Sequence, residues 1–152
     1  MTSGDGFVRL ADGSVRWGRF GAAGVLLRHA ADGGEPRYFV ARRSEWCHQG
    51  GTWAVPGGAL NAGEAPIEGA LREFSEEIGR SAGDHAVALV HEDDHGGWSY
   101  WTLVLDVAEP LEPPAELHWE TAEVRWVTAA ELAELELFPA FRVTLRRLGL
   151  TT

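Results

Sequence analysis

The sequence contains no lysine, only one cysteine and no long apolar run. All 13 basic residues are arginines, so no lysine is available as a nucleophile or for a Schiff base. The single cysteine, Cys47, cannot form an internal disulfide, which excludes a disulfide-stabilised domain, and we interpret its thiol as structural. No apolar run approaches the length of about 18 residues that a membrane span needs. The first residues also lack an apolar stretch behind basic residues, so we expect no signal peptide and a cytoplasmic protein.

The chain is strongly acidic, with a formal net charge of −10. Proteins that bind nucleic acid usually carry a basic patch. None is present here, so neither a nucleic-acid partner nor an RNA-end hydrolase is expected. An acidic protein that acts on phosphate compounds needs metal cations between its carboxylates and the substrate. The 152 residues, 45% of them apolar, suit one domain over residues 1–152 with its own core.

Hydrophobic patterning and turn residues predict strands mixed with three helices. Strands are expected over 21–27, 37–41, 52–55, 85–91, 98–107 and 123–127. Helices are expected over 65–78, over a short segment that Thr128 caps and that includes Glu131 and Leu132, and over 139–148. Residues 1–16 are polar and contain glycine, which indicates a loose N-terminal arm or a first edge strand. This mixture predicts a layered α/β domain.

The helix expected over 65–78 separates apolar from acidic residues. At about 100° per residue, its apolar residues fall in one arc that should face the sheet: Ile67, Ala70, Leu71, Phe74 and Ile78. Glu73, Glu76 and Glu77 fall in a different arc, at spacings i, i+3 and i+4. Like charges so placed repel by a few tenths of a kcal/mol per pair. Such a row is either a solvated acidic face or a ligand set for a hard cation such as Mg²⁺.

The segment before this helix favours the second interpretation. A strand leads into Pro56-Gly57-Gly58, where glycine lets the backbone approach a metal or phosphate closely and offers a carbonyl as ligand. Glu64 lies in the loop that enters the helix, eight residues before Arg72. These two side chains could pair and hold the loop against the helix.

Residues 57–80 resemble the signature box of the Nudix hydrolases. The box requires a glycine, a glutamate six residues later and an arginine with a cluster of glutamates on the following helix. The matching residues are Gly58, Glu64, Arg72, Glu73, Phe74, Glu76, Glu77 and Gly79. Arg80 departs from the pattern at a position that packs and does no chemistry. The flanking segments extend the resemblance over most of residues 18–148, which implies a Nudix-type α/β/α sandwich around a mixed β-sheet.

The resemblance also implies roles for these residues in a Mg²⁺-dependent enzyme, with Mn²⁺ as an alternative metal. Glu76 and Glu77 would be the main metal ligands, Glu73 a further ligand or the base for water, and the backbone carbonyl near Gly58 another ligand. Glu64 and Arg72 would orient the site. In the family a glutamate from a later loop often assists. We expect Glu120 in that role, with Glu123 as the alternative, because Glu120 precedes the strand and is freer to reach substrate.

The substrate is expected to be a nucleotide-like small molecule with a diphosphate linkage. Trp46 and His48 lie in a polar loop where a ring could stack on a base, and Arg42 could contact phosphate. The stretch after the box lacks the proline common in ADP-ribose hydrolases, and no coenzyme A signature is present. Nucleoside triphosphates therefore rank ahead of nucleotide sugars and dinucleoside polyphosphates. The competing hypothesis is a catalytically silent nucleotide-binding module, and a homodimer is compatible with either.

Overall fold

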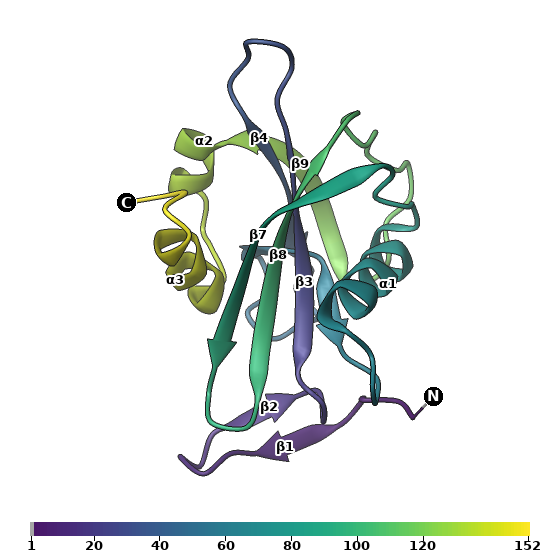
Figure 1. The fold of residues 1–152 in the computed structure, drawn as a ribbon, viewed down its shortest axis with the longest axis vertical. Coiled ribbons are helices and arrows are strands. Elements are labelled where there is room, and N and C mark those ends of the chain that lie inside the picture. Colours follow the sequence, from purple (N-terminus) through teal and green to yellow (C-terminus); the bar gives the residue numbers. More distant parts are fainter. Residues whose placement is uncertain (1) are drawn as a thin grey trace.

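The computed structural model describes residues 2–152 as a mixed β-sheet between two layers of helices (Figure 1). The strand order is β5-β4-β3-β8-β7, with β6 beside β3 and β9 beside β4. Among the described strands of this sheet, β3 and β8 are the one parallel pair. The strands are β3 (Ala22–His29), β4 (Arg37–Arg43), β5 (Trp53–Ala54), β6 (Gly57–Ala59), β7 (His85–Asp94), β8 (Ser99–Val107) and β9 (Thr121–Thr128). Helix α1 (Pro66–Ile78) covers one face, and α2 (Ala129–Glu134) and α3 (Pro139–Arg147) cover the other. The predicted α/β/α sandwich is confirmed.

Each face of the sheet has its own apolar core. On the α1 side, Phe74 and Ile78 of the helix pack with Phe39, Leu103 and Leu105 of the strands. The remaining predicted apolar positions of α1 are buried or partly buried against the same cluster. On the other side, α2 and α3 cover a second cluster, which includes Leu26, Val104 and Leu145. The predicted apolar arc of α1 therefore faces the sheet, which turns the acidic arc toward the sheet's edge.

Local signals account for the ends of the helices. Pro66 occupies the first turn of α1, and the Ala65 N–H donates to the Glu68 carboxylate at 3.0 Å. Gly79 ends the helix in the left-handed conformation, with φ 78°, and its N–H donates to the Ser75 carbonyl. The predicted Thr128 cap is also confirmed, because Thr128 and Glu131 exchange hydrogen bonds at the start of α2.

Two segments differ from the prediction. Residues 7–17 form neither a loose arm nor an edge strand of the main sheet, because β1 (Phe7–Arg9) and β2 (Val15–Trp17) pair as a separate antiparallel hairpin. The tight turn between them uses Gly13 at φ 87°, and the ring of Phe7 packs edge-on against Trp17. The sequence does not predict strand β6, because Pro-Gly-Gly is typical of the end of a strand. In the structure, Gly57 and Gly58 nevertheless pair with β3.

In the part of the chain that the structure describes, no helix combines the length and apolar character needed to cross a membrane.

Replacement of Phe74 by alanine should lower the free energy of unfolding by about 3–5 kcal/mol. Phe74 is fully buried, and its ring lies 5.9 Å from that of Phe39. Urea denaturation measures the loss. The control Phe7→Ala removes a ring that is 70% exposed, and it should cost less than about 1.5 kcal/mol. Equal losses in the two variants would contradict the assignment of Phe74 to the core.

Candidate active site

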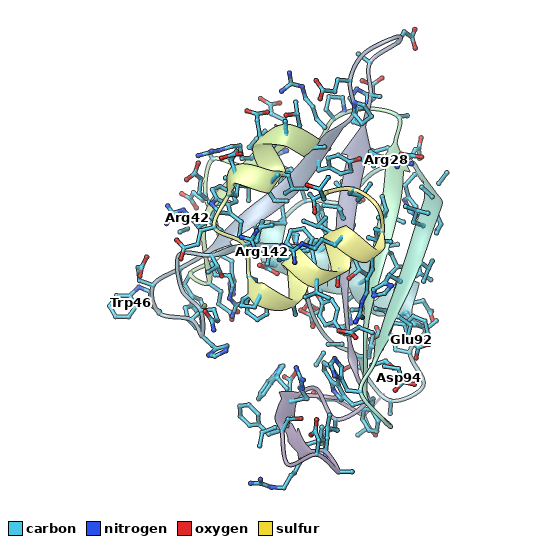
Figure 2. The ribbon with its side chains drawn as sticks, turned by 90° about the vertical axis from the view of Figure 1, so that its left-hand side faces the viewer. Arg28, Arg42, Trp46, Glu92, Asp94 and Arg142 are labelled. Atoms are coloured by element: carbon cyan, nitrogen blue, oxygen red, sulfur yellow. The ribbon has the colours of Figure 1, made fainter. Side chains whose placement is uncertain are left out.

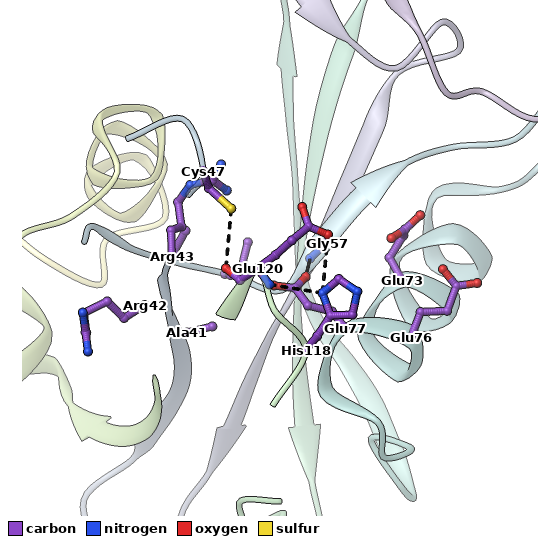
Figure 3. Close-up of a pocket in the computed structure, with 12 residues that line it drawn as sticks. Ala41, Arg42, Arg43, Cys47, Gly57, Glu73, Glu76, Glu77, His118 and Glu120 are labelled. Atoms are coloured by element: carbon purple, nitrogen blue, oxygen red, sulfur yellow. Dashed lines mark hydrogen bonds and ion pairs between the residues drawn. The ribbon is translucent and has the colours of Figure 1, made fainter. Parts of the chain in front are cut away.

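One cavity of about 150 Å³ brings together most of the predicted site residues (Figure 3). Helix α1 forms one wall, the ends of β4 and β5 form another, and the segment that precedes β9 closes it. Its lining comprises Ala41, Arg42, Arg43, Cys47, Ala54, Val55, Gly57, Glu73, Glu76, Glu77, His118 and Glu120. Four carboxylates from two elements far apart in the sequence thus share one cavity.

Glu77 is the most firmly held of the four carboxylates. One carboxylate oxygen accepts from the Gly57 N–H at 3.1 Å, and the other accepts from the Thr121 hydroxyl at 3.0 Å. Burial raises the pKa of Glu77, and these two hydrogen bonds oppose the rise only in part. The nearby Glu120 charge adds to it. The site therefore fixes the orientation of this carboxylate while leaving its negative charge without a full counter-charge.

Glu73 lies against the glycine strand β6. A Cβ on Gly58 would fall 2.5 Å from the Glu73 carboxylate, so only glycine admits this close approach. The Arg72 guanidinium donates to Glu73 at 2.9 Å. Burial nevertheless raises the pKa of Glu73 above its usual value, despite that partner.

The predicted pairing of Arg72 with Glu64 is confirmed, and the ion pair is bidentate. Arg72 Nε and Nη2 donate to the two Glu64 oxygens at 2.9 and 2.8 Å. Arg72 Nη2 also donates to the Ala59 carbonyl, and Glu64 accepts from the Asn61 N–H. The Glu64 side chain is only 6% exposed, and the guanidinium lowers its pKa. This network ties the loop after β6 to the helix that carries the glutamates.

The two remaining carboxylates of the cavity are more exposed. Glu76 has 60% of its side chain exposed, and Arg72 lies 3.5 Å from it. Glu120 reaches the cavity from the segment before β9, with its carboxylate 3.5 Å from His118 Nδ1. Glu123 takes no part in the lining, because it pairs with Arg125 at 2.7 Å and with Arg42 at 3.4 Å. The geometry thus favours Glu120 over Glu123 as the further carboxylate.

Of the three predicted substrate contacts, one lines the cavity and two do not. Arg42 lines the cavity, although Figure 3 shows its side chain extending away from the glutamates. Trp46 is 85% exposed and lies outside the lining (Figure 2). His48 packs its ring against Phe138, also outside the lining. The substrate-binding roles of Trp46 and His48 stay predictions, and any contact they make would be at the rim.

The sequence did not identify Cys47 and His118 as site residues, yet both line the cavity. The Cys47 thiol donates to the Glu120 carbonyl at 3.7 Å, and the Glu120 N–H donates to His118 Nδ1 at 3.3 Å. Both residues lie in loops without periodicity. Their proximity follows from tertiary contacts between segments more than seventy residues apart, so no signal in the sequence could have found it.

The donor set suits a hard cation. Among residues 2–152, no three His, Cys, Asp or Glu side chains already stand in the arrangement of a formed metal site. Arg72 holds Glu73, and Gly57 and Thr121 hold Glu77. The four cavity carboxylates nevertheless offer oxygen ligands alone, which is the chemistry that Mg²⁺ and Mn²⁺ prefer.

Comparison with known proteins gives consistent matches over almost the whole chain. The NUDIX domain model matches residues 18–148. A Mycobacterium tuberculosis protein named "Putative 8-oxo-dGTP diphosphatase 3" is 43% identical over 151 residues, which cover 95% of this chain and 69% of that protein. A Bifidobacterium longum "Nucleoside triphosphate pyrophosphatase/Nudix hydrolase fusion protein" is 39% identical, covering 91% of this chain and 30% of that protein. The crystal structure of the M. smegmatis Nudix hydrolase RenU aligns with a TM-score of 0.84 at 40% identity, over 95% of this chain and 92% of that chain.

Replacement of Glu77 by glutamine should raise the free energy of unfolding at neutral pH when a chelator removes metal ions. The amide has no charge to bury, and it can accept from the Gly57 N–H while donating to the Thr121 hydroxyl oxygen. In the wild type, a native pKa above the ordinary 4.5 means that the folded state keeps a proton that the unfolded state releases. The contribution of Glu77 to stability therefore falls as the pH rises from about 4.5 through the native pKa.

Urea denaturation between about pH 4.5 and pH 8 measures this difference. The stability of Glu77→Gln should fall less with rising pH than that of the wild type. The control for the substitution itself is Glu134→Gln, at an exposed residue of α2 outside the cavity. A Glu77→Gln protein that is less stable than the wild type at neutral pH, with an unaltered profile, would contradict this account of the buried carboxylate.

Proposed function

The chain belongs to the Nudix hydrolase family, and from that premise we propose that it is a divalent-metal-dependent pyrophosphohydrolase of nucleoside triphosphates. Water would hydrolyse one phosphoanhydride bond and release a nucleoside monophosphate and pyrophosphate. One observation carries the proposal. Glu73, Glu76 and Glu77 of α1 share a single cavity with Glu120. Glu73 and Glu77 remain in place there although burial destabilises their charged forms and raises the pKa of both.

The carboxylates of α1 are the residues that would hold the cation. Family members generally use a divalent metal, and Glu76 and Glu77 are the proposed main ligands, with Glu73 and a backbone carbonyl of the Gly57-Gly58 strand beside them. When bound, the cation neutralises phosphate charge and lowers the pKa of a bound water. The uncompensated charge at Glu77 supports this assignment, because a divalent cation would supply the missing counter-charge. Mg²⁺ is the favoured metal, with Mn²⁺ as the alternative.

The residues opposite the helix would orient substrate and move the proton. Glu120 is proposed to accept the proton of the attacking water, because it reaches the cavity from the segment before β9 and not from the helix that carries the other glutamates. Arg43 lines the cavity, and its positive charge lowers the pKa of both Glu77 and Tyr100, although burial raises each of them overall. It is fixed by donation to the His48 carbonyl at 2.8 Å and by its position over the Phe138 ring. We assign Arg43 to the phosphates of the substrate, whereas the predicted phosphate contact Arg42 extends away from the glutamates and pairs with Glu123.

The base of the substrate is proposed to be an oxidised purine. Two observations support a nucleoside triphosphate over a nucleotide sugar. The relative from Mycobacterium tuberculosis carries the name "Putative 8-oxo-dGTP diphosphatase 3", and the sequence lacks both the proline common in ADP-ribose hydrolases and the coenzyme A signature. The preference for an oxidised purine over dGTP is inferred from that relative, and the comparison of the two nucleotides below measures it.

The test is hydrolysis of dGTP, 8-oxo-dGTP, UDP-glucose and diadenosine tetraphosphate with Mg²⁺, with Mn²⁺ or with a chelator. We expect pyrophosphate from 8-oxo-dGTP, more slowly from dGTP, and none without metal. Glu76→Gln keeps the shape but removes a ligand charge, so kcat should fall by at least about 100-fold. The matched control is Glu134→Gln, an exposed residue of α2, which should retain wild-type turnover. Undiminished hydrolysis in chelator or in Glu76→Gln would refute the metal assignment.

A second pair of variants decides which loop carboxylate takes part in catalysis. Glu120→Gln should lower kcat by about 100-fold to 10,000-fold, the range for loss of a general base. Glu123→Gln should leave kcat near that of the wild type, because its carboxylate is committed to Arg125 and Arg42. A large loss in Glu123→Gln with none in Glu120→Gln would reverse the assignment. No loss in either would remove this segment from the mechanism.

A further inference from the structure

Strand β7 is a long, free edge of the main sheet. It ends the strand order and pairs only with β8 among the described strands, so one side of its ten-residue backbone has no strand partner. An open edge of this kind is a template for another strand, and proteins usually protect it with lysine, proline or a covering segment. Strand β7 contains neither lysine nor proline. Its protective features are the register shift between Val87 and Leu89 and the acidic residues Glu92-Asp93-Asp94 at its end, where Arg147 of α3 contacts Asp93 at 3.2 Å.

The edge also exposes apolar side chains on both faces of the sheet. Val87 and Val90 are 51% and 52% exposed, and they pair with Leu105 and Leu103, which belong to the core under α1. Leu89 is 37% exposed and pairs with Val104, which belongs to the core under α3. The helix layers therefore leave these three side chains exposed. A partner that pairs with the edge would bury apolar surface on both sides at once.

The charges along β7 identify which partner fits. His85 begins the strand, and Glu92-Asp93-Asp94 ends it, with Val87–Val90 between them. Figure 2 shows Glu92 and Asp94 along the free edge of the sheet. A second copy aligned in parallel would place one acidic end against the other. An antiparallel copy with a two-fold axis through Val90, normal to the sheet, keeps each side chain on its own face. Because Ala88 is the extra residue of the register shift, this alignment places each His85 opposite Asp94 and brings the two Val90 side chains together.

We propose that β7 is the interface of a homodimer in which two copies pair antiparallel and form one continuous sheet. The contact is isologous, because the same edge serves both protomers. The cavity lies toward the β4 and β5 end of the sheet, separated from β7 by β3 and β8. Each protomer would therefore keep its own open site, and the interface goes beyond the catalytic proposal and does not depend on it.

The test is the mass of the full chain in sedimentation velocity at near-physiological salt, from low to high micromolar protein. We expect a species of twice 16.5 kDa that dissociates on dilution. Val90→Lys places a charge at the centre of the paired edges and should give a monomer across the same range. The control Val143→Lys makes the same change at a residue of α3 that is 41% exposed, and it should remain dimeric. Circular dichroism and thermal unfolding verify that both variants fold.

Two further measurements identify the edge itself. His85→Glu places two carboxylates opposite each other at both ends of the interface, because residue 85 of each copy faces Asp94 of the other. The dissociation constant of the dimer should therefore rise by about threefold to tenfold. In the wild type, hydrogen exchange of β7 amides should slow as the protein concentration rises, and in Val90→Lys it should not. A wild type that is monomeric throughout, or a Val90→Lys protein that remains dimeric, would overturn the proposal. Dissociation by Phe7→Lys in place of Val90→Lys would also overturn it, because it would locate the contact on the β1–β2 hairpin.

Discussion

The bonds made by the Arg72 guanidinium are the constraint on which the candidate active site depends. This one side chain contacts Glu64 in the entering loop, the Ala59 carbonyl at the end of β6 and Glu73 on its own helix. Arginine is suited to this task because its planar group carries five donors in a fixed geometry and stays charged. It adds a polar anchor to the apolar one made by Leu60, which is buried in the core under α1. Arg72 thus supports the close approach of the helix carboxylates to the glycine strand, which the absence of a side chain at Gly58 permits.

The pKa shifts in and before α1 divide its carboxylates into one that stabilises the fold and two that destabilise it. Glu64 has a lowered pKa because Arg72 neutralises it, so its ionised form favours the folded state. Glu73 and Glu77 have raised pKa values because burial destabilises their charged forms by more than their hydrogen-bond partners stabilise them. Their ionised forms therefore disfavour the folded state. A fold that keeps two such carboxylates beside a cavity gives up stability at neutral pH. That cost is expected where charge must meet a cation or a reacting group.

The sequence predicted the helix-borne half of the site well and the loop-borne half poorly. Periodicity placed Phe74 in the core, and an eight-residue spacing placed Glu64 beside Arg72, because both follow from geometry within one short segment. Strand β6 was missed because glycine lacks the side-chain pattern by which strands are recognised, although its backbone pairs normally. His118 and Cys47 were missed because their position depends on how two distant loops pack. The free edge at β7 required the strand order, which depends on long-range pairing that single-strand patterns do not contain.

The two halves of the cavity are therefore built by different means. The helix carboxylates are carried on a regular element that is anchored by buried apolar residues and by Arg72. The opposite side combines the ends of β4 and β5 with two loops that bond to each other. The Ser44 N–H donates to the Glu120 carbonyl at 2.9 Å, and the Cys47 thiol approaches the same oxygen. Thr121 links this wall to the helix through its hydrogen bond to Glu77. Loops vary more readily than the elements that carry them. A change in the loops around Cys47 and His118 would therefore alter what the cavity admits, while the helix glutamates and their chemistry stay in place.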